Sequence, residues 1–288
     1  MSNPAARAVA TSLRVLPRKR ISRLVGQLSR VEAPDSVLSV AMRVYCRAYD
    51  VDLADYEIPS EGFVSFDAFF TRKLKPGARP IEADPDVLVA PADGRVEDLG
   101  PIERGSTFLV KGRPYSVVEL LGDEQATAEY EGGSFAIVYL SPRDYHRVHA
   151  PVTGPVTAIR HVPGTLYPVN SIGLSHVPNL FARNERVVVH QRSERHGRIA
   201  SIMVGAIGVG RISLAFDESV LTNDDRESGL RVYGDRAPQL SRGDELGTFH
   251  LGSTVIVLIA PDQASQLCVE RGATVRMGEP LARRGRAQ

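Results

Sequence analysis

The sequence has few cysteines and no long apolar run, and both absences narrow the class of protein. Only Cys46 and Cys268 occur in 288 residues, so we expect no disulfide framework, and a reducing cytosolic setting is indicated. No apolar run approaches the length that crosses a bilayer. Arg14, Pro17 and the basic residues 18–20 also interrupt the N-terminal apolar residues before a signal peptide can form. The net charge of +1 gives no indication of nucleic-acid binding.

The composition is otherwise that of a globular protein. Hydrophobic residues make up 43% of the chain and charged residues 24%, which are ordinary values. The length suits one large domain or two small ones, and such a chain buries a core without covalent cross-links.

The first 31 residues lack acidic side chains altogether. The basic residues among them are Arg7, Arg14, Arg18, Lys19, Arg20, Arg23 and Arg30. In the same segment Ile21, Leu24, Val25 and Leu28 recur at helical spacing and form one apolar stripe. A basic amphipathic helix can lie in a membrane interface, or it can pack its stripe on the protein body. The segment taken alone favours packing.

A helical region precedes a β-rich one. Residues 1 to about 60 have a helical pattern with breaks at Pro17 and Pro34, and a further short helix is expected over 66–74. From about residue 86, short apolar segments alternate with glycine and proline. The clearest predicted strands cover 134–140, 186–192, 200–216 and 253–261. We therefore predict an α+β fold, with N-terminal amphipathic helices followed by a mainly antiparallel, sandwich-like or barrel-like β domain.

A short internal repeat supports the β assignment. The segments "APADGRV" (90–96) and "APVTGPV" (150–156) share the pattern A-P-x-x-G-x-V. Two matching strand–turn–strand units predict a duplicated hairpin motif.

The densest polar cluster is "YLSPRDYHRVHAP" (139–151), which contains His146 and His149. The H-x-x-H spacing can indicate a metal site, but no cysteine accompanies it, so no metal is predicted. Non-functional surface histidines are one interpretation of this pair. Proton transfer near neutral pH is the other.

Two further residues are candidates for chemistry. Asp93 lies in a D-G pair that is usually a turn, but a buried aspartate could instead orient a histidine. Ser253 stands in "LGST", where small polar residues open the apolar strand that follows. A turn is the simpler explanation of this placement, and a nucleophilic serine requires partner residues.

In combination these motifs resemble the phosphatidylserine decarboxylase family. The segments "FDAFFTRKLKPGARPI", "APADG", "YLSPRDYHRVHAP", "HVPGTLYPVN" (161–170) and "LGST" occur in this order over nearly the whole chain. The resemblance implies that the chain cleaves itself between Gly252 and Ser253 into a large chain, 1–252, and a small chain, 253–288. Ser253 would attack the Gly252 carbonyl to form an ester. Elimination and hydrolysis, with loss of ammonia, would then leave a pyruvoyl group.

The resemblance also implies roles for individual residues. His149 would activate Ser253 and Asp93 would orient His149. The pyruvoyl ketone would form a Schiff base with the substrate amine and act as the electron sink for decarboxylation. His146 is the candidate for contacting the substrate carboxylate or protonating Cα, and Tyr167 and Asn170 are candidate headgroup contacts.

A lipid substrate changes the expectation for the N-terminus. Residues 1–62 become a predicted membrane-associating region on an anionic surface, and 63–288 the catalytic domain. We expect a peripheral protein on the cytoplasmic face of the cell membrane, with the two chains of one precursor as partners. The resemblance also allows a homodimer, and no nucleic-acid partner is expected.

Two other functions remain open from the residues themselves. A serine hydrolase could use Ser253, His149 and Asp93 without cleavage, although the G-x-S-x-G elbow is absent. A non-enzymatic β module would account for the repeat alone.

Overall fold

The computed structural model describes residues 18–208, 211–220, 222–223, 229–261 and 265–285. The side chains of Arg18, Lys19, Ser171, Ile172 and Ser253 lie outside the description, as do Arg7 and Arg14 of the predicted basic segment. The helices are α2 (Arg18–Ser29), α3 (Asp35–Tyr49), α4 (Phe66–Phe70), α5 (Val117–Leu121), α6 (Glu124–Thr127), α7 (Ser171–His176) and α8 (Leu180–Arg183), with 3-10 turns at Ala128–Tyr130 and Gly234–Arg236.

An antiparallel nine-stranded sheet organises the β region. Its order is β11 (Gly229–Val232), β7 (Gly154–Val162), β8 (Arg186–Ser193), β9 (Gly197–Val204), β14 (Ser253–Ile259), β5 (Ser134–Leu140), β2 (Gly94–Pro101) and β16 (Thr274–Val275), with β12 (Gln239–Leu240) beside β7. Three small sheets accompany it: β1 (Val87–Val89), β17 (Pro280–Arg284) and β15 (Ser265–Leu267); β10 (Arg211–Leu214), β13 (Glu245–His250) and β6 (Arg147–His149); and β3 (Thr107–Val110) with β4 (Arg113–Ser116).

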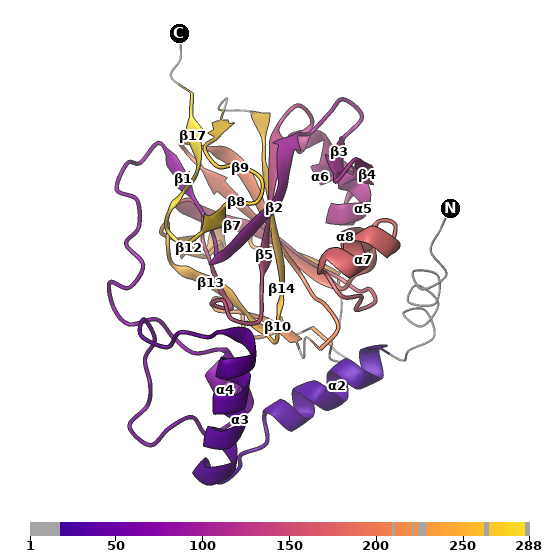
Figure 1. The fold of residues 1–288 in the computed structure, drawn as a ribbon. Helices are drawn as coiled ribbons and strands as arrows, with labels where there is room; N and C mark the ends of the chain where they lie inside the picture. The colour runs from indigo at the N-terminus through magenta and orange to yellow at the C-terminus, as the bar shows by residue number, and fades with distance from the viewer. Residues whose placement is uncertain (1–17, 209–210, 221, 224–228, 262–264, 286–288) are drawn as a thin grey trace.

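Both faces of the large sheet are buried. One face packs against the sheets that contain β1 and β13, and the other against α5–α8 and the β3–β4 pair (Figure 1). Side chains of a strand alternate between faces, so Val255 and Val257 of β14 enter the first core and Ile256 and Leu258 the second. The uninterrupted apolar run of this strand follows from burial on both faces.

The predicted α+β architecture and element order are confirmed, with adjusted boundaries. Helix α3 begins directly after Pro34, and β5 spans 134–140 as expected. The predicted helix over 66–74 is shorter, since α4 ends at Phe70. The predicted strand over 200–216 is two strands, β9 and β10, which belong to different sheets.

In each copy of the internal repeat, the backbone turns a corner from one sheet into another. In each copy a three-residue strand, β1 or β6, leads through the A-P turn to a long strand that begins at Gly94 or Gly154. The strand–turn–strand prediction is confirmed. The two strands of a copy, however, pair with different partners and not with each other, so neither copy is a hairpin.

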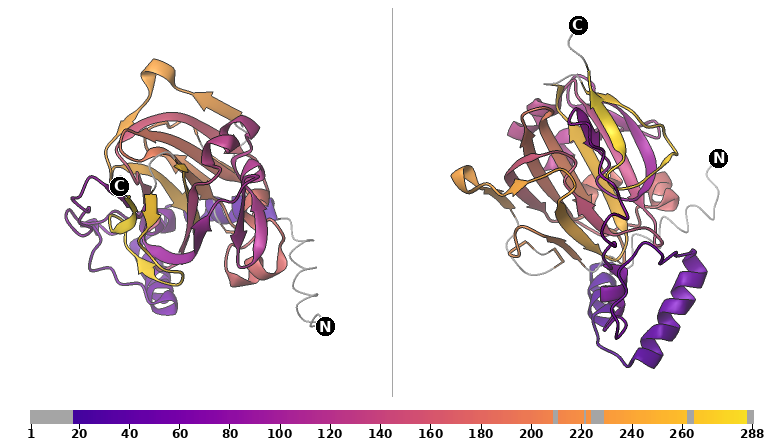
Figure 2. Two further views of the ribbon diagram at one scale, coloured as in Figure 1. Left: turned by 90° about the horizontal axis from the view of Figure 1, so that it is seen from above. Right: turned by 90° about the vertical axis from the view of Figure 1, so that its left-hand side faces the viewer.

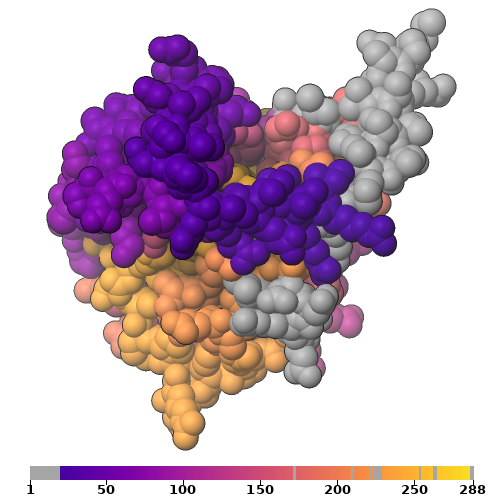
Figure 3. Space-filling model, turned by 90° about the horizontal axis from the view of Figure 1, so that it is seen from below, coloured from indigo at the N-terminus to yellow at the C-terminus, as the bar shows by residue number. Residues whose placement is uncertain are grey.

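The N-terminal helices cover one end of the β body. Helices α2, α3 and α4 lie together at the lower end of the molecule, and α2 runs across the face seen from below (Figures 1 and 3). The buried residues of α2 are the small Ser22, Gly26 and Ser29, and the Ser22 hydroxyl accepts a hydrogen bond from the Gly208 amide at 3.1 Å. No described helix is long and apolar enough to cross a membrane.

The predicted apolar stripe of α2 is divided between two environments. Ile21 and Val25 are half-buried, whereas Leu24 and Leu28 are 56% and 62% exposed. A helix packed through its whole stripe would bury all four residues. Exposed apolar side chains continue beyond α2 along α3, and both helices lie at the lower end of the molecule in the second view of Figure 2. These side chains are Val31, Val37, Val40, Val44 and Tyr49.

Candidate active site

Ser253 is the first residue of β14, in the middle of the large sheet. It pairs with Leu140 of β5, and the next residue, Thr254, pairs with Tyr139 on one side and Val204 on the other. The turn before it has two consecutive residues with left-handed backbone, Leu251 at φ 84° and Gly252 at φ 37°.

The Gly252 position requires glycine for its conformation. A Cβ added there would meet no atom within 4 Å, so space is not limiting. Leucine at positive φ is uncommon and costs about 1–3 kcal/mol. The chain is therefore held in a strained bend immediately before Ser253.

Asp93 lies at the same end of the sheet as Ser253. Arg95 of β2 pairs with Tyr139, which pairs with Thr254 of β14, so Asp93 precedes a strand two places away, roughly 10 Å across the sheet. Gly94 is required here, because an added Cβ would lie 2.5 Å from the Tyr139 carbonyl oxygen. The close approach of β2 and β5 fixes the position of the Asp93 backbone.

The Asp93 carboxylate is firmly held. The Arg79 guanidinium donates to both of its oxygens, at 2.7 and 3.1 Å, and the Met277 amide donates at 2.8 Å. Arg79 also donates to Asp55 at 2.7 Å. This aspartate is a fixed, charge-paired group and not a simple turn residue.

His149 is buried at the same end, where its amide donates to the Pro91 carbonyl at 2.7 Å. Its Nδ1 lies 2.8 Å from the Gly243 carbonyl, and its Nε2 lies 3.0 Å from the Tyr145 hydroxyl. A carbonyl only accepts, so Nδ1 carries the proton and Nε2 accepts from Tyr145. Burial lowers the pKa of His149, while the Gly243 carbonyl opposes that shift.

The environment of His149 suits a general base. The imidazole is neutral and its basic nitrogen, Nε2, has a defined direction. Asp93 is close enough for its charge to act weakly on the pKa of His149, but both ring nitrogens are bonded elsewhere. Orientation of His149 by Asp93 therefore stays a prediction, as does activation of Ser253 by His149.

His146 has a different environment from His149. It is 1% exposed, and its ring stacks on Phe70 with centroids 4.0 Å apart. Neither ring nitrogen forms a hydrogen bond of good geometry with another described residue, although the Ser141 and Pro142 carbonyls lie close enough to act on the ring. Burial, with a smaller contribution from the positive charge of Arg72, lowers the pKa of His146 to about 3.

The two histidines are separated along the β6–β13 ladder. The His146 carbonyl accepts from the Phe249 amide at 3.0 Å, whereas His149 pairs with Glu245 at the far end of β13. His146 thus lies beside the part of β13 that leads into the Leu251–Gly252 turn. A buried imidazole whose nitrogens form no well-aligned hydrogen bond to the described residues can receive a polar group of a substrate.

Tyr167 and Asn170 lie on the connection between β7 and α7. Tyr167 is buried, and its hydroxyl accepts from Arg183 at 3.1 Å. The Asn170 side chain accepts from the Gly173 amide at 3.2 Å, at the start of α7. These contacts are structural, and the headgroup roles of both residues stay predictions.

Several residues of the site were not assigned from the sequence. Tyr145 lies inside the 139–151 motif, four residues before His149, and this spacing was the sequence signal that could have predicted their contact. Arg79 was assigned to a loop, and only the fold places it against Asp93. Arg72 is 2% exposed, lies 4.2 Å from the Tyr56 ring centroid and donates to the Arg143 carbonyl at 3.1 Å. It holds the loop that carries His146.

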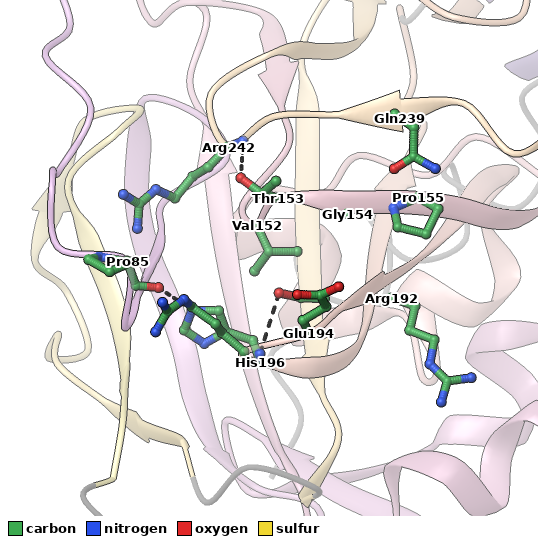
Figure 4. Close-up of a pocket in the computed structure, with 12 residues that line it drawn as sticks. Pro85, Val152, Thr153, Gly154, Pro155, Arg192, Glu194, His196, Gln239 and Arg242 are labelled. Carbon is green, nitrogen blue, oxygen red and sulfur yellow. Dashed lines mark hydrogen bonds between the residues drawn. The ribbon is translucent and has the colours of Figure 1, made fainter.

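A separate cavity of about 440 Å³ lies at the turn between β8 and β9 (Figure 4). Arg192, His196 and Arg242 are among its lining residues. This turn is at the opposite end of β9 from Val204, which pairs with Thr254, a separation of roughly 25 Å. The cavity is therefore remote from the predicted site. In the described part of the chain, no group of three or more His, Cys, Asp or Glu could hold a metal ion.

The site combines a strained turn before Ser253, a buried His146 beside the strand that leads into this turn, and a charge-paired Asp93 at the same end of the sheet, an arrangement that suits an enzyme with a reactive serine. The model of the phosphatidylserine decarboxylase family matches residues 66–283. The chain therefore belongs to the phosphatidylserine decarboxylase family, and it is a decarboxylase, a lyase, rather than a serine hydrolase or a non-enzymatic module.

Curated relatives agree with this assignment. A protein of Myxococcus xanthus (strain DK1622) is 40% identical over 270 residues, which cover 93% of this chain and 95% of the relative. One of Shewanella baltica (strain OS155) is 41% identical over 275 residues, covering 93% and 94%. One of Brevibacillus brevis (strain 47) is 40% identical over 270 residues, covering 93% and 94%. Each is named phosphatidylserine decarboxylase proenzyme.

Proposed function

We propose that this protein decarboxylates phosphatidylserine to phosphatidylethanolamine and CO2, after self-cleavage between Gly252 and Ser253 converts Ser253 to a pyruvoyl group. The observation that carries the proposal is the left-handed turn at Leu251 and Gly252, followed directly by Ser253 in a strand paired on both sides. Such a bend brings a serine hydroxyl toward its own preceding carbonyl, and the strand keeps the new terminus in place.

In this proposal Ser253, His149 and Asp93 supply the maturation chemistry. Ser253 attacks the Gly252 carbonyl, and the ester that forms replaces the peptide bond. His149 accepts the hydroxyl proton at Nε2, which becomes available when the Tyr145 hydroxyl releases it. Asp93, fixed by Arg79, contributes negative charge that favours the resulting imidazolium.

The buried surroundings fit a pyruvoyl group at position 253. Among the described residues, the Ser141 and Pro142 carbonyls act on the His146 ring, but neither forms a hydrogen bond of good geometry with it, so the ring could receive a carboxylate or carbonyl brought beside the turn. When present, the pyruvoyl ketone supplies the electron sink that no side chain provides. His146 then binds the substrate carboxylate or delivers a proton to Cα, and Phe70 and Arg72 hold its ring and loop.

The exposed face of α2 and α3 suits docking on a bilayer that contains this lipid. Leu24, Leu28 and Val44 are each more than half exposed, and Arg20, Arg23, Arg30, Arg43 and Arg47 are exposed basic residues on or beside these helices. Val40, Arg43, Val44, Arg47 and Ala48 of α3 line a hollow of about 470 Å³. Apolar insertion combined with basic contacts is typical of peripheral binding to anionic lipid, here on the cytoplasmic face of the cell membrane.

The mass of the denatured protein tests the maturation proposal. We expect chains 1–252 and 253–288, the small chain lighter by one ammonia than a chain with an N-terminal serine. Ser253→Ala should give one intact, inactive chain. His149→Ala and Asp93→Asn should accumulate intact chain, whereas His190→Gln, a buried histidine remote from the turn, should cleave normally. A free serine amine on an active enzyme would disprove the pyruvoyl assignment.

His146→Ala separates the two reactions. We expect this variant to cleave at least partly and to decarboxylate poorly, because in our proposal His149 serves Ser253 and His146 serves the substrate. Normal cleavage with full decarboxylation would remove His146 from the mechanism.

A further inference from the structure

A second hydrogen-bonded set of serine, histidine and aspartate lies on the outer face of the β10–β13–β6 sheet, separate from the residues discussed above. The His250 Nδ1 lies 2.9 and 3.0 Å from the two carboxylate oxygens of Asp67, and its Nε2 lies 3.1 Å from the Ser213 hydroxyl. The His250 and Asp67 side chains are 12% and 11% exposed. Three elements distant in sequence, α4, β13 and β10, meet at this one imidazole.

The partners define how His250 is held. A carboxylate accepts hydrogen bonds, so Nδ1 donates its proton to Asp67, while Nε2 shares a hydrogen bond with the Ser213 hydroxyl. Both nitrogens are thus satisfied, and the ring can neither rotate nor flip without losing a largely buried, charge-assisted hydrogen bond.

Helix α4 is also fixed to the same sheet by a second contact. Arg147 of β6 donates from Nε to the Thr71 carbonyl at 2.9 Å, directly after α4, and pairs with Glu245 of β13 at 2.7 Å. The Ser65 hydroxyl caps the start of α4 by accepting from the Ala68 amide. Helix α4 is therefore fixed at both ends, and it presents Asp67 to His250 as a rigid support.

His250 connects this hydrogen-bonded set to the strained turn before Ser253. It is the last residue of β13, and the strained Leu251 and Gly252 follow immediately. A leucine in left-handed conformation persists only when its surroundings hold it. The attack of a hydroxyl on its own preceding carbonyl depends on a near-attack geometry. Any loosening of His250 would allow the turn to relax away from that geometry.

We propose that His250 and Asp67 are positioning residues for self-cleavage, holding the entry to the Leu251–Gly252 turn in its bent conformation. This inference rests on the proposed cleavage between Gly252 and Ser253. His250 contacts neither reacting atom in this role. It acts through the backbone, and its contribution ends when the bond is cut, since β13 and β14 are then no longer joined.

The test is a time course of cleavage of the full-length precursor made by cell-free translation. His250→Ala and Asp67→Ala should each slow cleavage by about tenfold or more. His250→Asn should recover much of the rate, because its amide can still donate to Asp67. Ser213→Ala should have a smaller effect, and His190→Gln should cleave at the wild-type rate. The turnover of the cleaved fraction, measured per small chain, should stay within about twofold of wild type for the His250 variants.

The outcomes separate this inference from the proposed function. Wild-type protein that does not cleave at this bond would disprove the proposed function. Cleavage by the wild type together with wild-type rates for His250→Ala and Asp67→Ala would overturn the positioning role alone. Equal losses of cleavage rate, mature turnover and melting temperature would also overturn it, since they would show a general loss of structure.

Discussion

Tyr145 and His149 form a buried contact that the proposed maturation chemistry would use. The phenol donates to Nε2, the nitrogen that accepts the proton of Ser253 in that proposal. Burial raises the pKa of the Tyr145 hydroxyl, so the phenol remains a neutral donor at physiological pH. It thereby fixes the direction of the imidazole without transferring charge to it.

Tyr145→Phe tests this contact. We expect self-cleavage to slow by about tenfold, because His149 would keep only its Gly243 contact and lose its orientation, with a stability cost of about 1 kcal/mol for the lost hydrogen bond. Densitometry of the two chains over time measures the rate. Faster cleavage would instead show that Tyr145 competes with Ser253 for Nε2.

His190, which lies away from the predicted active site, should make the free energy of unfolding depend on pH. Its Nδ1 lies 3.2 Å from the Tyr130 hydroxyl, and burial lowers its pKa from 6.5 to about 4. Between these values the unfolded chain binds a proton that the folded chain does not, so stability falls as the pH drops from about 6.5 toward 4.

The expected loss at pH 5 is about 2 kcal/mol for this one histidine. His190→Gln should flatten the decline of the melting temperature between pH 7 and pH 5, measured by differential scanning fluorimetry. A decline as steep as that of the wild type would show that other groups carry it.

At the scale of elements, helix α2 has one face that packs on the β body and another that is exposed and apolar, and its sequence pattern did not distinguish them. Small residues meet the β body, through Ser22 and Gly208 among others, and the larger Leu24 and Leu28 remain exposed. Rings of α3 and α4 also pack together across the predicted domain boundary at residue 62, with Tyr45 and Phe66 centroids 5.2 Å apart. That boundary stays a prediction.

Serine substitutions on α2 and α3 test membrane docking. Replacing Leu24, Leu28, Val40 and Val44 with serine should reduce co-sedimentation with phosphatidylserine vesicles and barely change the melting temperature, because these side chains are at least half exposed. The matched control is Leu38→Ser, a residue of α3 that is 6% exposed, which should lower the melting temperature. Unchanged vesicle binding by the fourfold variant would exclude this face as the docking surface.

At the scale of the whole molecule, cleavage would divide the chain without separating its parts. The segment after Gly252 supplies β14, which pairs along its length with β5 and β9, and β17, which pairs with β1 and β15. Removal of the small chain would open the large sheet at its centre and expose both cores.

We therefore expect the two chains to remain associated under native conditions. Native mass spectrometry should show the large and small chains together, and denaturing conditions should show them apart. The complex should resist dilution and high salt, since apolar burial and backbone hydrogen bonds hold it. Loss of the small chain on gel filtration in plain buffer would contradict this account of the fold.

Local patterns in the sequence were sufficient for the order of helices and strands, the repeat and the family motifs. Pro34 marks the start of α3, and the apolar run of β14 reflects burial on two faces, because these signals depend on neighbouring residues. The A-P repeat likewise predicted two matching turns, although not that each joins two sheets.

Only the tertiary structure decided which distant groups meet. Sheet register sets Asp93 two strands from Ser253, packing of α4 buries His146 and supports His250, and the fit of Ser22 to Gly208 selects the buried face of α2. Each of these depends on contacts between residues far apart in the chain. Spacing within one segment contains no information about them, since periodicity records whether a face is buried but not what buries it.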